Sequence, residues 1–159
     1  MTGSGSYAEP AGWSASSIWQ ETLIPGSAVA TTGNGTRVYQ GLSGFSGPMT
    51  YGTEEEYGPF RSNQSGDSFG IFGYIGGIFV PTNYVWGSQL SGTSLFGEAT
   101  FEAFGINPGT YVWTWNVAGG GTDSLTLQII PEPTQWALVG VGLVALGLVA
   151  SCKRGAAHS

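Results

Sequence analysis

The body of the chain, from Ser14 to Gln128, alternates short apolar and aromatic runs with clusters of glycine, asparagine, proline and serine. Runs rich in valine, isoleucine, threonine and aromatic residues are typical of strands, and the clusters between them are typical of turns. The pattern predicts roughly seven to nine strands. We therefore expect a mainly β body with antiparallel pairing.

The clearest strand runs from Thr110 to Val117, where the character of the side chains alternates at every residue. One face carries Tyr111, Trp113, Trp115 and Val117. Beyond three glycines, Asp123–Ile130 alternates in the same way, so the two strands are expected to form an antiparallel hairpin. Such hairpins favour a β-sandwich or jelly roll.

Two glycine-containing turns predict further hairpins. They are Asn34-Gly35, between Val29–Thr32 and Arg37–Tyr39, and Gly76-Gly77, between Phe69–Tyr74 and Ile78–Val80. Asn-Gly readily adopts the positive φ angles of a tight turn. The sequence predicts one helix in the body, one or two turns over Ala99–Phe104 closed by Gly105.

The composition changes abruptly after Ile130. Trp136–Ala150 contains no charged residue and no strand-like alternation. As a helix, Trp136–Cys152 would be about 25 Å long, which is enough to cross a bilayer. Trp136 suits one membrane interface, and Lys153 with Arg154 supplies the positive charge that favours the cytoplasmic side.

The pattern therefore predicts two parts, a β-sandwich ectodomain over 1–130 and a tail over 131–159 with one C-terminal transmembrane helix at 136–152. A buried core helix is the alternative for the apolar run. A β-rich body has little room for a helix that is apolar on all sides, so we favour the membrane span.

Charge and reactive residues exclude several functions. Only 9% of the residues are charged, the net charge is −6, and Arg37 and Arg61 are the basic residues of the body, so nucleic-acid binding is not expected. The single histidine, His158, and the single cysteine, Cys152, lie in the tail, which argues against a histidine-based triad or a zinc site in the body. We predict no catalytic residue, no metal and no cofactor.

Acidic clusters offer weaker candidates. Glu54–Glu56 with Asp67 could supply oxygen ligands to calcium, but their spacing matches no calcium loop, and a solvated loop is the preferred interpretation. Glu98 and Glu102 would share one helical face, as acid–base chemistry requires. An ordinary exposed helical turn explains this pair better.

The order of elements in the tail resembles the PEP-CTERM sorting signal: Pro131-Glu132-Pro133-Thr134, a tryptophan-led apolar helix, then a basic pair. The resemblance covers about the last thirty residues. It implies that an exosortase, a membrane-embedded transpeptidase resembling cysteine proteases, recognises Pro131, Glu132 and Pro133. It further implies that this enzyme removes the helix, passing the protein from the inner membrane to the cell surface.

The body also resembles a recurrent ectodomain of that family. The resemblance rests on Asn107–Trp115 followed by Asp123–Leu127, with weaker similarity around Phe79–Pro81, Leu90–Gly92 and Ala99–Phe101. Met1–Ser17 lacks the apolar stretch of a signal peptide. Because the family carries a signal peptide and a strand or more ahead of the segment that matches Gly3–Ser6, we expect an upstream start and a truncated N-terminus.

Together these features predict a non-enzymatic cell-surface or extracellular biofilm-matrix protein of a Gram-negative bacterium. The resemblance implies exosortase, the membrane and exopolysaccharide as its partners. The alternative is a carbohydrate-binding module that stacks sugars on exposed Tyr111, Trp113 and Trp115. Core packing is the preferred interpretation of these three rings, and a hydrolase would require several acidic residues to converge.

Overall fold

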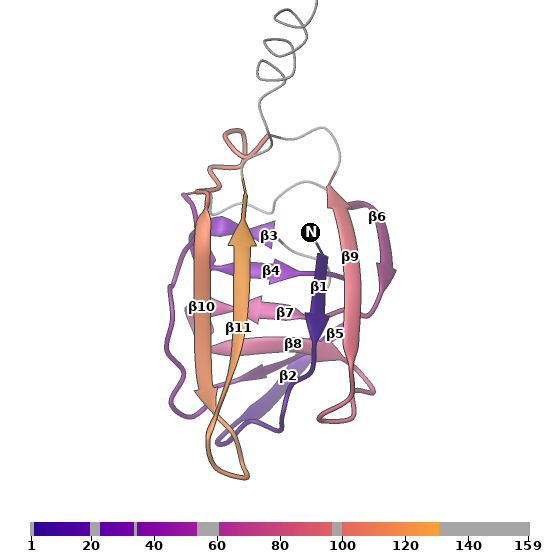
Figure 1. The fold of residues 1–159 in the computed structure, drawn as a ribbon, viewed down its shortest axis with the longest axis vertical. Coiled ribbons are helices and arrows are strands. Elements are labelled where there is room, and N and C mark those ends of the chain that lie inside the picture. Colours follow the sequence, from indigo (N-terminus) through magenta and orange to yellow (C-terminus); the bar gives the residue numbers. More distant parts are fainter. Residues whose placement is uncertain (1, 20–22, 34, 54–60, 97–99, 131–159) are drawn as a thin grey trace, which may run out of the picture. The chain divides into compact units, whose positions relative to one another are not determined.

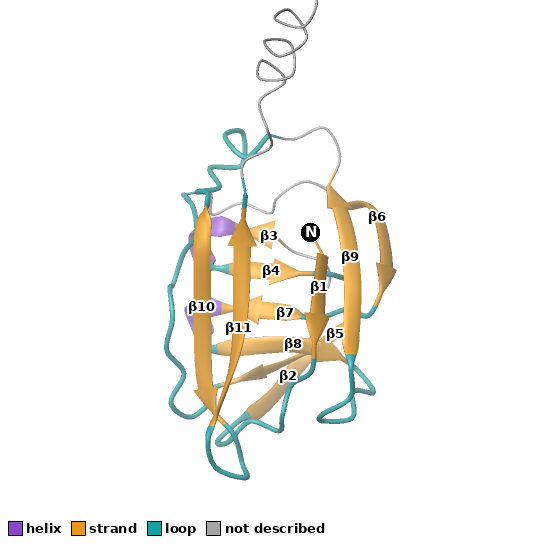
Figure 2. Cartoon of the chain, viewed as in Figure 1, coloured by secondary structure: helices purple, strands orange, loops and turns teal. Residues whose placement is uncertain are grey.

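The computed structural model describes the backbone of residues 2–19, 23–33, 35–53, 61–96 and 100–130. Contacts divide the chain into two units, Met1–Ile129 and Ile130–Ser159. The described part consists of eleven strands and two short 3₁₀ helices, η1 (Pro25–Ser27) and η2 (Gly73–Ile75), as Figure 2 shows. The expectation of a mainly β body with antiparallel sheets is confirmed.

One layer of the first unit is a six-stranded antiparallel sheet. In spatial order its strands are β2 (Ser14–Trp19), β5 (Thr36–Gln40), β8 (Gly77–Pro81), β7 (Gly70–Phe72), β4 (Val29–Thr31) and β3 (Leu23–Ile24). Each strand pairs antiparallel with its neighbours in this order. This sheet forms the back of the sandwich in Figure 1.

The facing layer contains two separate sheets. The first has the order β1 (Thr2–Gly5), β9 (Leu90–Phe96) and β6 (Arg61–Gly66), and the second pairs β10 (Gly109–Asn116) with β11 (Thr122–Ile129). Figure 1 shows their strands crossing in front of the six-stranded sheet. The two layers therefore pack as a sandwich whose strand directions cross steeply, one of the two usual ways in which sheets stack.

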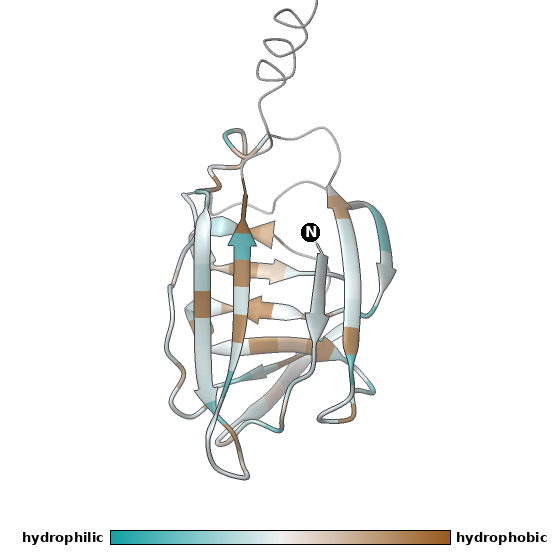
Figure 3. Ribbon diagram, viewed as in Figure 1, coloured by the Kyte–Doolittle hydropathy of each residue, from teal (hydrophilic) through white to brown (hydrophobic). Residues whose placement is uncertain are grey.

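The main hydrophobic core lies between the layers. Ile71, Ile78 and Val80 of the six-stranded sheet and Trp113 and Trp115 of β10 are fully buried in it. A second cluster includes Phe79 from the same strand as Ile78 and Val80, so alternate residues of β8 serve different clusters. Because both faces of this strand are buried, its sequence is apolar throughout and shows no alternation. Figure 3 shows the resulting apolar bands.

The predicted hairpin near the end of the body is confirmed. β10 and β11 pair antiparallel along their full lengths, with Trp113 opposite Leu125. The connecting turn contains Gly120 and Gly121, both with positive φ. The alternation in both strands correctly predicted which side chains face the core.

The two glycine-turn predictions have opposite outcomes. β7 and β8 form a hairpin, with η2 and Gly76 at φ +64° between them, as the sequence predicts. The prediction of a hairpin at Asn34-Gly35 is wrong, because its two strands do not pair with each other. Strand β4 pairs with β3 and β7, whereas β5 pairs with β2 and β8. In the sheet, β8 and β7 lie between β5 and β4.

The helix predicted over Ala99–Phe104 is not formed in its described part. Residues 101–105 make consecutive turns, in which the Phe104 amide donates to the Thr100 carbonyl at 3.3 Å and the Gly105 amide to the Glu102 carbonyl at 3.1 Å. Gly105 closes this segment with φ +54°, as predicted. The segment is too short to propagate a helix, whose first turn is costly to nucleate.

The described residues include no helix of the length and apolar character that a membrane span needs. The transmembrane helix predicted at 136–152 lies outside those residues. It therefore stays a prediction.

Candidate functional site

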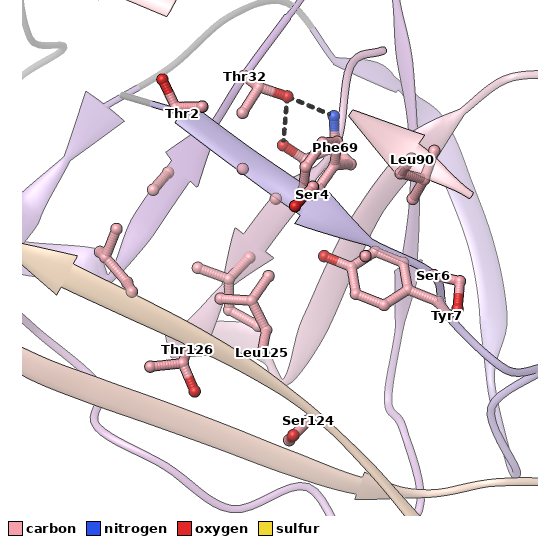
Figure 4. A pocket seen from close by; sticks show the side chains of 16 residues that line it. Thr2, Ser4, Ser6, Tyr7, Thr32, Phe69, Leu90, Ser124, Leu125 and Thr126 are labelled. Atoms are coloured by element: carbon pink, nitrogen blue, oxygen red, sulfur yellow. Dashed lines mark hydrogen bonds between the residues drawn. The ribbon is translucent and has the colours of Figure 1, made fainter. Parts of the chain in front are cut away.

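A cleft of about 150 Å³ opens between β1 and β11 in the layer that faces the six-stranded sheet. Residues 2–7 line one side, and residues 124–127 line the other. Ala30, Gly70 and Ile71 of the six-stranded sheet also line it, together with Phe69 and Leu90. The cleft therefore combines an apolar interior with the serine and threonine hydroxyls of its two strands, which Figure 4 labels.

The cleft exists because β1 and β11 are joined at one end and are not paired to each other. Beyond β1, the Ala8 amide donates to Asp123 Oδ2 at 2.9 Å. A little further on, Ala11 donates to the Asn116 carbonyl at 2.9 Å, and Ala118 donates to the Glu9 carbonyl at 2.8 Å. These bonds attach the segment after β1 to the β10–β11 hairpin and close that end of the cleft.

Glycine in β1 allows the strand to lie close to the core. A Cβ at Gly3 would meet Phe69 Cζ at 2.8 Å. Phe69 is held from behind, since its amide donates to Thr32 Oγ1 at 3.0 Å and the Thr32 amide donates to its carbonyl at 2.8 Å. The Thr32 hydroxyl lies 2.9 Å from the Asp67 carbonyl and 3.1 Å from the Phe69 carbonyl, to either of which it can donate. The Phe69 ring is therefore fixed in position and packs against β1 at Gly3.

Tyr7 is the most unusual group in the cleft. Its side chain is 5% exposed, and its hydroxyl has no hydrogen-bond partner among the described residues. The ring packs edge-on against Trp115, Phe69 and Tyr84, with centroid distances of 5.7, 6.3 and 6.4 Å. Burial raises the pKa of Tyr7 above its ordinary value, and the charges of Asp123 and Tyr84 act in the same direction. Tyr7 therefore offers a neutral hydroxyl, which Figure 4 shows directed between the two strands.

The aromatic residues considered for sugar stacking lie in the core. Trp113 and Trp115 are each 0% exposed, and Tyr111 is partly buried. Trp113 donates its indole N–H to the Pro48 carbonyl at 2.7 Å. The preference for core packing is confirmed for the two tryptophans. Because their faces are covered, neither can stack on a sugar.

A different aromatic group reaches the surface, and the sequence analysis did not single it out. Trp13 is 38% exposed and lies edge-on to Tyr39, with ring centroids 4.6 Å apart. Trp86 approaches Tyr39 from its own side at 5.0 Å. Contacts at these angles direct ring edges onto ring faces, so the rings mostly cover one another.

The acidic candidates do not form a described site. Asp67 Oδ2 accepts the Ser91 amide at 2.9 Å, and Asp123 binds the amides of Ala8 and Ser124. Both carboxylates therefore stabilise loops. The structure brings together no group of three metal-ligating side chains within the residues it describes. Glu54–Glu56 and Glu98 lie outside the described residues.

The sorting residues predicted from the sequence also lie outside the described residues. They are Pro131, Glu132 and Pro133 of the motif and Trp136, Lys153 and Arg154 at the boundaries of the apolar run. Comparison of the chain with protein-family models, with curated proteins and with solved structures gives no match.

Proposed function

We propose that this chain is a non-enzymatic cell-surface or extracellular-matrix protein, which an exosortase sorts and processes through Pro131, Glu132 and Pro133. The observation that carries the proposal is the order of elements in the last thirty residues: the motif, the apolar run and the basic pair. Exosortase and the inner membrane are its partners during export. The cell surface and its exopolysaccharide are the destination.

The residue types suit this role physically. Two prolines keep a short segment extended, because their rings fix φ and disfavour helix in the preceding residue. Glu132 adds one negative charge that an enzyme pocket can recognise. The last described strand, β11, ends at Ile129, so a processing enzyme would meet the motif directly after the folded body.

Carbohydrate binding is the alternative that the sequence leaves open. The observation that would have favoured it is exposure of Trp113 and Trp115, and both are buried. We therefore do not propose a sugar site on β10. Association with exopolysaccharide remains part of the proposal only as the destination of a sorted protein.

The proposal is tested by changing the motif in an exosortase-producing bacterium. The triple variant Pro131→Ala, Glu132→Ala, Pro133→Ala should stay in the inner membrane at its full size, whereas the wild-type chain should reach the surface or medium in a shorter form. A matched control changes Glu102 and Pro108 to alanine, the same residue types on the exposed surface of the body. If the triple variant is processed like this control, the motif is not the sorting element.

A further inference from the structure

The layer facing the six-stranded sheet is interrupted between β11 and β1. Figure 1 shows the β10–β11 pair and the β1–β9–β6 sheet in one layer, and residues of β1 and β11 line the cleft. Adding one strand at this position would join the sheets of two and three strands into a layer that matches the six strands behind it. We propose that the cleft binds an extended peptide of a second protein as a strand between β1 and β11.

Main-chain groups on both sides of the cleft supply the recognition. β1 pairs with β9 along one edge, and β11 pairs with β10 along one edge. Among the described strands, neither has a neighbour along its other edge. Strand edges of this kind bind extended peptides through main-chain hydrogen bonds, which give affinity with little dependence on sequence.

The Tyr7 hydroxyl is a second, independent observation that points to a ligand. A buried hydroxyl normally has a hydrogen-bond partner, because burial without one is costly. Tyr7 lines the cleft, and its hydroxyl has no partner within the described part of the chain. A peptide carbonyl in the cleft would accept the hydrogen bond that Tyr7 can donate.

The lining defines the side chains of the peptide. Inward side chains would meet Phe69, Ile71 and Leu125, and the cavity of about 150 Å³ between these residues favours small apolar side chains. Outward side chains would lie beside the hydroxyls of Ser4 and Thr126. The fitting peptide therefore alternates small apolar residues such as valine with serine or threonine.

Charge favours a neutral or basic peptide. Asp123 lies at the closed end of the cleft, Glu9 follows Tyr7 by two residues, and the chain has a net charge of −6. The chain's own apolar run, 136–150, lacks the alternating polar residues that the outward positions need. A neutral or basic segment of a second protein fits the charge and the pattern of the lining, and this inference does not depend on the sorting proposal. A strand ahead of Thr2 in the same polypeptide would occupy the same edges, and the test below distinguishes it by protection without added peptide.

The test uses the full-length chain in detergent and the acetylated, amidated peptide Lys-Val-Ser-Val-Thr-Val-Ser-Lys. Binding should slow amide hydrogen exchange in both Thr2–Gly5 and Thr122–Ile129. Two control peptides carry N-methyl groups, one on the valines and the other on the serines and threonine. Because alternate residues donate to opposite edges, each control blocks one edge, and each should bind at least about tenfold more weakly.

The variant Tyr7→Phe should retain the fold and bind the peptide about threefold to tenfold more weakly, because it loses one hydrogen bond. Leu95→Ala, an exposed change on β9, is the control and should bind like the wild type. Since main-chain bonds supply the affinity, absence of protection at millimolar peptide contradicts the proposal. Protection of one strand alone also contradicts it. Protection of both strands before peptide is added would mean that the polypeptide closes the cleft itself, which overturns the proposed source.

Discussion

Trp113 donates its indole N–H to the carbonyl oxygen of Pro48 at 2.7 Å, which fixes the loop before Tyr51 against the centre of β10. Its neighbour on the same face, Trp115, is equally buried, but its indole nitrogen has no partner among the described residues. Two tryptophans in the same strand and the same core therefore differ in one hydrogen bond.

This difference predicts unequal costs for the same substitution. Trp113→Phe and Trp115→Phe both lose packing, but Trp113→Phe also leaves the Pro48 carbonyl without its donor. We expect Trp113→Phe to lower the free energy of unfolding by about 1 kcal/mol more than Trp115→Phe. Urea denaturation of both variants measures the difference. Equal losses would show that the Pro48 contact does not stabilise the fold.

The two buried tyrosines form a second matched pair. The hydroxyl of Tyr51 donates to the Val29 carbonyl, whereas that of Tyr7 has no described partner. Tyr51→Phe should therefore cost about 1 to 2 kcal/mol, and Tyr7→Phe should be close to neutral. Thermal and urea unfolding measure both. A large loss for Tyr7→Phe would mean that its hydroxyl is already bonded in the free protein.

The same tyrosines predict sensitivity to alkaline pH. Burial raises the pKa of both above the ordinary value of 10.0. The unfolded chain therefore releases these protons at a lower pH than the folded chain. Their contribution to stability is complete below about pH 10 and is lost as pH rises from there towards the folded pKa values, at about 1.4 kcal/mol per pH unit for each tyrosine.

Denaturation between about pH 8 and pH 11 measures this loss, and Tyr7→Phe should remove one of the two contributions. Stability that does not fall above about pH 10 would show that neither tyrosine is shielded from solvent.

The close approach of β7 to its neighbour β4 predicts how much stability is lost when one methyl group is added at Gly70. A Cβ at Gly70 would lie 1.9 Å from the Ala30 carbonyl oxygen, whereas one at Gly119 would meet no atom within 4 Å. Gly70→Ala should cost about 2 to 4 kcal/mol, because backbone must move, and Gly119→Ala should change stability by less than about 0.5 kcal/mol. Equal unfolding midpoints for the two variants would contradict the described register of β4 and β7.

The sequence predicted the strands whose side chains alternate, β10 and β11, and missed strands without an apolar pattern, such as β1 and β6. The alternation that includes Trp113 and Trp115 predicted both the strand β10 and its buried face. β1 consists of threonine, serine and two glycines, so no apolar pattern marks it as a strand, and the cleft beside it could not be foreseen. The pairing of β4 and β5 failed for another reason, since Asn-Gly specifies a turn but not the strands that later fill the sheet.

The sandwich, its core and its cleft follow from contacts between named residues. The proposal of sorting rests on the order of residues after Ile130, and the C-terminal sequence of the mature protein tests it.

The C-terminal sequence and intact mass of the mature protein, isolated from the surface and medium of an exosortase-producing bacterium, test the sorting proposal. We expect a mass that lacks the apolar run and a new C-terminus at or next to Pro131–Pro133. A mature protein that retains Trp136–Ser159 and stays in the inner membrane would contradict it, because the tail would then be an anchor and not a processed sorting signal.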